Sequence, residues 1–217
     1  MYKKVIALLL LSSSASAWSI TVGEMTYFMG SNQTYLSKAV LNDSTQARYY
    51  QVTVEETDPP YKGAKLHKVV KGALLYAPKQ LLLRPNETKF LKLYYQGPSD
   101  DQPRYYRVTF HERPGFSMHS VSEAYFSGTA SLSTILVVQP RQPKQSYQLS
   151  NGVLRNNGNT VYLAYAQAPC SDEAEKCVKE KYLIPGGELV LDTLSAQSGT
   201  LFLSNETMQE IPMTGTP

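Results

Sequence analysis

From Trp18 onward, the chain consists of short segments in which apolar and polar residues alternate, separated by turn-forming residues. This alternation is typical of β-strands that bury one face, because successive side chains of a strand point to opposite sides. A helical period is hard to find. Strands at intervals of about ten residues predict an all-β protein built from β-sandwiches. The clearest strand segments are 35–43, 47–57, 79–98 and 104–114.

The stretch "EAYFSGTASLSTILVVQPRQP" (123–143) changes its pattern half-way. In its first part, small or apolar residues alternate with Tyr, Ser and Thr; they are Ala124, Phe126, Gly128, Ala130 and Leu132. From Ile135 to Val138 every residue is apolar. The pattern predicts one long strand that is half-buried at its start and wholly buried at its end. The residues alone leave two interpretations open: an edge strand over the protein's own core, or a strand offered to a partner.

The segment "QPRQPK" (139–144) is the best domain boundary, because its two prolines stiffen the chain and cannot continue a ladder. We therefore expect a larger N-terminal sandwich, residues 18–140, and a smaller C-terminal sandwich, residues 141–217. In the second domain, the dipeptides Asn151-Gly152 and Asn157-Gly158 predict tight hairpins.

Residues 1–17 have the pattern of a cleavable signal peptide. Two lysines precede an apolar run, Val5 to Leu11, and the small residues of Ala15-Ser16-Ala17 follow. The apolar run is too short to span a bilayer. We expect export to the periplasm with cleavage after Ala17, and a mature protein that is not embedded in the membrane.

Charge and cysteine content narrow the function further. Without the signal peptide's two lysines the formal charge falls from +3 to +1, which argues against nucleic acid as a partner. The only two cysteines are Cys170 and Cys177, and in an oxidising compartment such a pair is expected to form one disulfide. That bridge would contribute roughly 2–3 kcal/mol. A metal site would need more ligands than these.

Catalytic patterns are missing from the sequence. It contains three histidines, His67, His111 and His119, and no nucleophile elbow, zinc-binding helix motif or phosphate-binding loop. A metal or acid–base role for His111 and His119 stays an alternative to solvated loop residues. We therefore expect no enzyme activity, no cofactor and no metal site.

Several segments in chain order resemble the periplasmic chaperones of the chaperone–usher pilus pathway, the PapD-like superfamily. They are "FMGSNQTYLSKAVLND", "LLLRPNETKFLKLYYQGPSDDQPRYYRV", "TILVVQPRQ", and "NGVLRNNGNTVYLAYAQAPC" followed by "CVKEKYLIPGG". The resemblance is strongest to the alternate branch that serves the common pilus. It implies two Ig-like β-sandwich domains in a boomerang arrangement.

The resemblance also implies a function. Such chaperones lend the last strand of their first domain to pilin subunits that lack a strand, and deliver them to an outer-membrane usher. Here the lending face would consist of Ala124, Phe126, Gly128, Ala130 and Leu132, while the Ser/Thr face meets water. Residues Ile135 to Val138 would lie in the chaperone's own core near the elbow, the segment that joins the two domains. Whether the free protein caps itself as a dimer stays open.

One departure from the family concerns the anchor for the subunit's C-terminal carboxylate. The better-known chaperones use an Arg and a Lys, and Met25 and Ile135 stand at those places in this chain. We infer that Lys38, on the inward face of its strand, and Arg107, on the strand beside the lending strand, form the anchor. The alternative is a lysine that extends to solvent and an ordinary surface arginine.

Two other classes of exported protein compete with the chaperone interpretation. A pilus subunit or adhesin with Ig-like domains would carry an alternating donor tail at its N-terminus, whereas "WSITVGEMTYFMG" runs directly into strand-like sequence. A carbohydrate-binding module would need clustered exposed aromatic residues. The paired tyrosines, such as Tyr105-Tyr106, should instead split across two faces of a strand.

Overall fold

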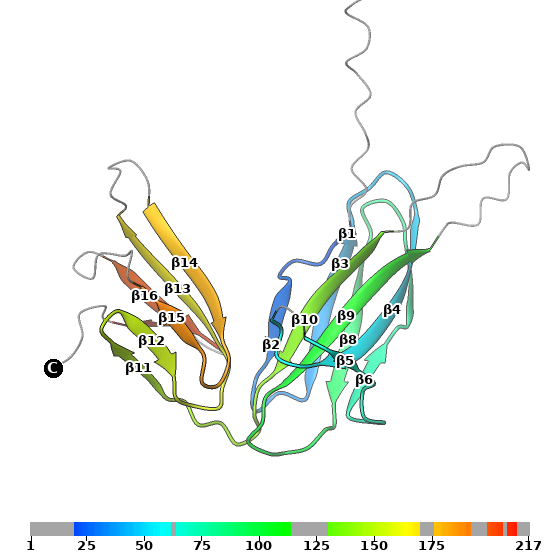
Figure 1. The fold of residues 1–217 in the computed structure, drawn as a ribbon. Helices are drawn as coiled ribbons and strands as arrows, with labels where there is room; N and C mark the ends of the chain where they lie inside the picture. The colour runs from blue at the N-terminus through cyan, green and yellow to red at the C-terminus, as the bar shows by residue number, and fades with distance from the viewer. Residues whose placement is uncertain are drawn as a thin grey trace, which may run out of the picture.

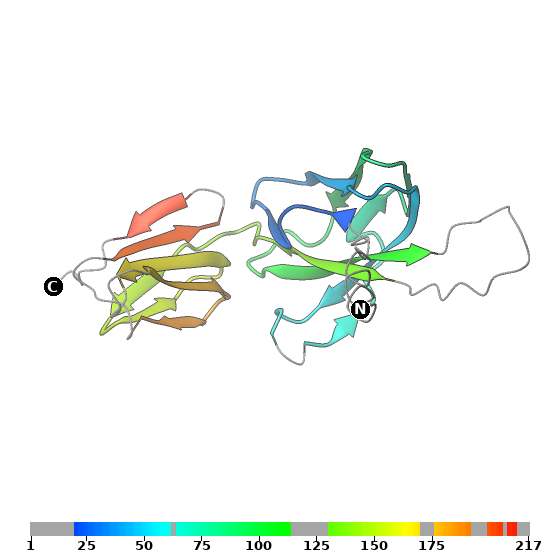
Figure 2. The same cartoon turned by 90° about the horizontal axis from the view of Figure 1, so that it is seen from above.

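The computed structural model describes residues 20–61, 64–113, 130–169, 176–191, 199–205 and 208–211. Every regular element within these ranges is a β-strand, and the strands form two sandwiches set at an angle (Figure 1). Seen from above, the two sandwiches lie end to end, joined by the segment that follows β10 (Figure 2). No described segment forms a helix long and apolar enough to cross a membrane.

The N-terminal sandwich contains two sheets. In spatial order, the β3–β8 sheet consists of β1 (Ile20–Thr21), β3 (Tyr35–Asn42), β8 (Thr88–Tyr95) and β6 (Leu74–Ala77). The β9–β10 sheet, in the same kind of order, consists of β2 (Thr26–Met29), β10 (Ser131–Val138), β9 (Arg104–Arg113), β4 (Arg48–Thr57) and β5 (Leu66–His67). A further strand of this sheet, β7 (Gln80–Leu83), pairs with β4.

The core of this domain follows the alternation seen in the sequence. From β9, the side chains of Tyr106, Val108 and Phe110 point between the sheets and are fully buried. From β10, Leu136 and Val138 join the same core. Side chains two residues apart therefore share the interior face, as strand geometry requires.

The C-terminal sandwich also has two sheets. One consists of β11 (Tyr147–Ser150), β12 (Val153–Asn156) and β15 (Glu188–Val190). The other consists of β14 (Lys176–Leu183), β13 (Tyr162–Pro169), β16 (Thr200–Ser204) and β17 (Met208–Ile211). Leucine and alanine side chains fill its core, among them Leu154, Ala164, Ala166, Leu183 and Leu201.

The two Asn-Gly dipeptides have different roles. Asn151 and Gly152 both have positive φ, 48° and 72°, which is the two-residue hairpin turn expected between β11 and β12. The hairpin predicted at Asn157-Gly158 is wrong, because β12 and β13 belong to different sheets. Gly158 is needed there for close packing: a Cβ atom would lie 2.1 Å from the carbonyl oxygen of Lys144.

An apolar contact joins the two domains at the elbow. Tyr105 and Val137 of the N-terminal domain pack against Val161 of the C-terminal domain, and Phe28, Ile135 and Ile184 surround them. The rings of Phe28 and Tyr182 lie 6.1 Å apart, centre to centre. Residues Ile135 to Val138 are therefore all apolar because one face of β10 contacts the core and the other contacts the elbow.

A buried glutamine adds a polar link to this elbow. Gln139 is 2% exposed, and its side-chain nitrogen donates to the carbonyl oxygen of Val161 at 2.7 Å. The backbone N–H of Val161 donates to the side-chain oxygen of Gln139 at 2.9 Å. A single carboxamide thus satisfies both backbone groups of one residue in the other domain, as a neighbouring strand would.

The predicted all-β fold with two Ig-like domains is confirmed. The boundary after residue 140 stays a prediction, although β10 ends at Val138 and β11 begins at Tyr147. Cys177 is disulfide-bonded and packs against the C-terminal core. Because Cys170 lies outside the described residues, its pairing with Cys177 also stays a prediction, as does the signal peptide of residues 1–17.

We expect Gln139→Leu to loosen the elbow. Leucine cannot bond the N–H and C=O of Val161, and a buried polar group left unpaired costs about 1–3 kcal/mol. Small-angle scattering should show a broader range of interdomain angles, and the melting temperature should fall. Gln142→Leu, at an exposed neighbour that bonds the carbonyl of Ser99, is the control and should change neither quantity. An unchanged scattering profile for Gln139→Leu would contradict the role of the link.

Candidate functional site

Strand β10 has a paired edge and a partly unpaired edge. On one side, all eight residues pair with β9 in antiparallel register. On the other side, the parallel strand β2 covers only Ile135 to Val138. Within the part of the chain that the structure describes, no strand pairs with residues 131–134 on the β2 side. We call this segment the free edge.

The backbone of the free edge directs hydrogen-bonding groups away from the sheet. The N–H of Glu112 donates to the carbonyl of Ala130 at 2.9 Å, so the even-numbered residues of this region bond to β9. The N–H of Ile135 donates in the other direction, to the carbonyl of Met25 at 2.8 Å. Since backbone groups alternate along a strand, Ser131 and Ser133 point theirs toward the unpaired side. They offer two donors and two acceptors to an additional strand.

The side chains of the free edge divide between two faces. Leu132 is partly buried against the N-terminal core, and the buried Thr134 is 3.4 Å from the hydroxyl of Tyr27. Ser131 and Ser133 are exposed on the opposite face. Of the predicted lending residues, Ala130 and Leu132 are described, and Ala130 is exposed. The remaining three, Ala124, Phe126 and Gly128, lie outside the described residues.

The sequence predicted that the Ser/Thr face of β10 meets water, but in the structure this face also forms side-chain contacts to the neighbouring strands. The hydroxyls of Ser133 and Thr109 are 2.9 Å apart. The ring of His111 bridges three strands, with Nδ1 at 3.1 Å from the Ser131 hydroxyl and Nε2 at 3.0 Å from the Thr53 hydroxyl. Sequence reasoning missed this role, because it placed His111 at a loop. The polar bonds hold the free edge onto β9 while leaving its other side open.

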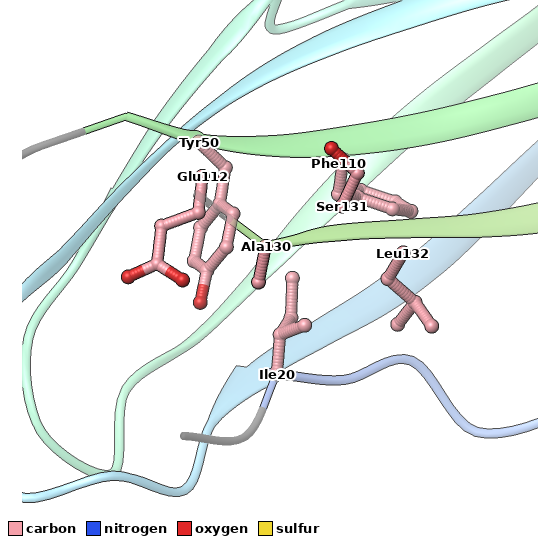
Figure 3. A pocket seen from close by; sticks show the side chains of 7 residues that line it. All are labelled: Ile20, Tyr50, Phe110, Glu112, Ala130, Ser131 and Leu132. Carbon is pink, nitrogen blue, oxygen red and sulfur yellow. The ribbon is translucent and has the colours of Figure 1, made fainter. Parts of the chain in front are cut away.

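Beside the free edge, the N-terminal core opens into a cavity of about 200 Å³. Its lining comes from both sheets: Ile20, Tyr50, Phe110, Glu112, Ala130, Ser131 and Leu132. Figure 3 shows Ile20 of β1 opposite Ala130 and Leu132, with Tyr50 and Glu112 at one end. We call this cavity the hollow. It exists because β1 lies in one sheet and β10 in the other, so that the sandwich is open between them.

Among the described residues that line the hollow, only Glu112 is charged, and a cation compensates it. The Arg48 guanidinium contacts the Glu112 carboxylate at 2.8 Å, with side chains that are 11% and 9% exposed. Burial raises the pKa of Tyr50 to about 12, and the nearby Glu112 carboxylate acts in the same direction. The phenol therefore stays protonated at neutral pH. The hollow is an apolar site with a neutralised polar end.

The structure does not bring the predicted anchor residues together. Lys38 is buried between the sheets, where its Nζ donates to the carbonyl of Glu24 at 2.7 Å and lies 4.2 Å from the centre of the Tyr27 ring. Burial lowers the pKa of Lys38, and the charge of Glu24 opposes this only in part. Arg107 is half-buried on the other face of the β9–β10 sheet, between Tyr105 and Thr109.

The face that carries Arg107 is the one that turns toward the C-terminal domain, since Tyr105 on it contacts Val161. We call it the inner face. Arg107 lies directly opposite Ile135 on β10 and Glu55 on β4. It forms no ion pair with any residue that the structure describes. Among those residues there is likewise no cluster of three or more His, Cys, Asp or Glu side chains that could hold a metal ion.

Comparison with known proteins adds to this geometry. Residues 145–213 match the family described as the EcpB C-terminal domain. The chain is 36% identical over 174 residues to the probable fimbrial chaperone EcpE of Escherichia coli O127:H6, covering 77% of this chain and 73% of that protein. It is 32% identical over 193 residues to the probable fimbrial chaperone EcpB of Klebsiella pneumoniae, covering 86% and 87%. The chain belongs to the fimbrial chaperone family.

The fold of this chaperone also matches solved structures. One is the Salmonella enterica SafA pilin in complex with the SafB chaperone, with a TM-score of 0.54 at 13% identity, covering 90% of this chain and 96% of the matched chain. The relatives EcpE and EcpB confirm the predicted membership of the common-pilus branch. Fimbrial chaperones are a non-enzymatic family of the periplasm, where the chaperone–usher pathway assembles fimbriae.

We expect His111→Ala to weaken the attachment of the free edge to β9. Two side-chain hydrogen bonds are lost, each contributing roughly 0.5–1.5 kcal/mol. Urea unfolding should show a corresponding loss of stability, and amide exchange should accelerate at Leu132, whose N–H points to β9. The control is His67→Ala. The exposed ring of His67 contacts Asp58, just after β4, so its removal should change stability and exchange little. Equal stability and exchange in the two variants would refute the bridging role.

Proposed function

We propose that this chaperone captures pilin subunits by lending them the free edge of β10. A subunit that lacks one strand of its own would pair with β10 and complete its sheet. The chaperone would hold the subunit in this form and deliver it to the outer-membrane usher. The lending face would extend from Leu132 and Ala130 back through Gly128, Phe126 and Ala124.

The observation that carries this proposal is the unpaired half of β10. Ser131 and Ser133 offer four backbone groups, which would contribute roughly 2–6 kcal/mol if each formed one hydrogen bond. An unpaired strand edge is a template for another strand, and β-augmentation uses it with main-chain bonds for affinity. The solved pilin–chaperone complex with the same fold supports a pilin as the strand's recipient.

The second half of β10 explains how the first half can pair with a subunit while the strand stays attached to the chaperone. Residues Ile135 to Val138 pair with both β9 and β2, and their side chains contact the domain core on one face and the elbow cluster on the other. The strand is therefore held firmly at the elbow while its first half stays available. In the same proposal, the signal peptide is cleaved after Ala17 and brings the chaperone to the periplasm.

We further propose Arg107 as the cation that binds the subunit's C-terminal carboxylate. It lies on the inner face, beside Ile135, and its fork of N–H donors can bind a carboxylate through two bonds. Lys38 lies on the other side of the β9–β10 sheet, buried beside Tyr27 and the carbonyl of Glu24. Its buried ammonium, with a lowered pKa, would still gain from a nearby anion, so its contribution stays a separate prediction.

We expect Ser133→Pro to abolish subunit capture. Proline removes the one N–H that Ser133 directs to the unpaired side, and its ring obstructs a neighbouring strand, while the even-numbered bonds to β9 remain. The measurement is recovery of the cognate pilin with the tagged chaperone from periplasmic extracts, together with the affinity of the purified pair. Circular dichroism and melting temperature report whether the variant folds.

The matched control for this variant is Ser133→Ala. It loses the hydroxyl contact to Thr109 but keeps the backbone N–H, so it should recover the pilin like the wild type. If a folded Ser133→Pro protein recovered as much pilin as Ser133→Ala, strand lending through this edge would be excluded.

We expect Arg107→Gln to lower pilin affinity at least about tenfold, and Arg107→Lys to retain part of it, because the charge remains while the bidentate geometry is lost. Arg113→Gln is the control: Arg113 lies on the same strand and bonds the side chain of Gln51 far from the elbow. Lys38→Gln, measured in parallel, tests the second predicted anchor. Full affinity in Arg107→Gln would exclude it as the anchor.

A further inference from the structure

The hollow lies where an additional strand would direct its side chains. A strand that pairs with the free edge lies about 4.8 Å from β10, in the same sheet, and its alternate side chains must point to the face of Leu132. That face is the interior of the sandwich, and the hollow opens there between Ile20 and Leu132. The incoming strand thus presents one of its inward residues to this cavity.

We infer that the hollow receives one bulky apolar side chain from the edge strand of the bound subunit. This inference rests on the proposed function and adds a contact in which the subunit, not the chaperone, supplies the side chain. Besides lending side chains to the subunit's groove, the chaperone would accept one into its own core. The subunit residue would complete the packing between β1 and β10.

The size of the hollow indicates which side chains fit. An apolar cavity of about 150 Å³ takes up a benzene ring, so about 200 Å³ holds the ring of a phenylalanine or the branched end of a leucine. An unfilled space of this size beside a core is unfavourable, because its lining lacks contacts on one side. A subunit side chain that fills the hollow would supply the missing van der Waals contacts, and these would contribute to the affinity.

The chemistry of the lining indicates which side chains are rejected. Ile20, Phe110 and Leu132 offer no hydrogen bonds, so an uncompensated charge would lose its hydration. At the polar end, Arg48 is already paired with the Glu112 carboxylate, so it cannot compensate an acidic side chain as well. The hollow therefore selects an aromatic or branched aliphatic residue and excludes Asp and Glu.

The test replaces Ile20, which lines the hollow from β1 and is not part of the lending strand. Ile20→Trp should fill the cavity and lower affinity for the purified cognate pilin at least about tenfold. Thr21→Trp is the matched control, because Thr21 is the next residue on the same strand, is exposed, and bonds Asp43 outside the hollow. It should change affinity less than about twofold. Melting curves of both variants establish that they fold.

A second measurement does not depend on the tryptophan variant. Each apolar residue on the pilin's pairing strand is truncated to alanine and combined with Ile20→Ala in double-mutant cycles. One pilin position should couple to Ile20 by at least about threefold, and the others should be additive. Additivity at every position would overturn the inference, as would wild-type affinity of a folded Ile20→Trp chaperone.

The two proposals fail in different ways. If Ser133→Pro abolishes binding while Ile20→Trp leaves it intact, strand lending holds and the inference about the hollow is wrong. If the wild-type chaperone binds no pilin at all, the proposed function and the inference both fall.

Discussion

The unequal pairing of β10 is the constraint on which the rest of this structure depends. One edge of the strand is bonded to β9 along its whole length, whereas the other is bonded to β2 only from Ile135 to Val138. Solvated backbone groups at an open edge cost the free protein little, yet they are a template for any chain that can supply a strand. The chaperone therefore keeps the hydrogen-bonding capacity of Ser131 and Ser133 available for a partner. The elbow makes this arrangement durable, because the apolar cluster around Val137 and the Gln139 link hold the strand's second half in place.

An unpaired strand edge beside an open core favours aggregation. Each face of β10 limits this tendency in its own way. On the polar face, the bonds from His111 and Thr109 tie the serines to the sheet, so that the strand stays in register when no subunit is bound. On the interior face, Ile20 and Leu132 leave a hollow that is small and has Glu112, paired with Arg48, at one end. In the proposed mode of binding, a partner must match both the ladder and the hollow. That double requirement favours a subunit strand of the right pattern over an arbitrary hydrophobic segment.

Local patterns were sufficient for much of the fold. Alternation placed Tyr106, Val108 and Phe110 on one face of β9, and the type of turn at Asn151-Gly152 followed from two residues that tolerate positive φ. The same local reasoning failed at Asn157-Gly158, where the glycine is required by a chain segment that is distant in sequence. It also expected the paired tyrosines to point to opposite faces of a strand. Tyr105 and Tyr106 do point to opposite faces, but both are buried, because the elbow covers the face that solvent would otherwise reach.

In the candidate site too, some features follow from local sequence patterns and others from tertiary contacts. By itself, the sequence determined that one strand is half-polar and then wholly apolar, since side-chain alternation is a property of the strand alone. Only the tertiary structure decided that β2 stops short of Ser131, that β1 stands across a hollow from Leu132, and that His111 bridges Thr53 and Ser131. It also separated Lys38 and Arg107, which parity alone could not do, by placing the β9–β10 sheet between them. These features depend on which strands become neighbours, and strand pairing joins residues whose distance along the chain no local pattern encodes.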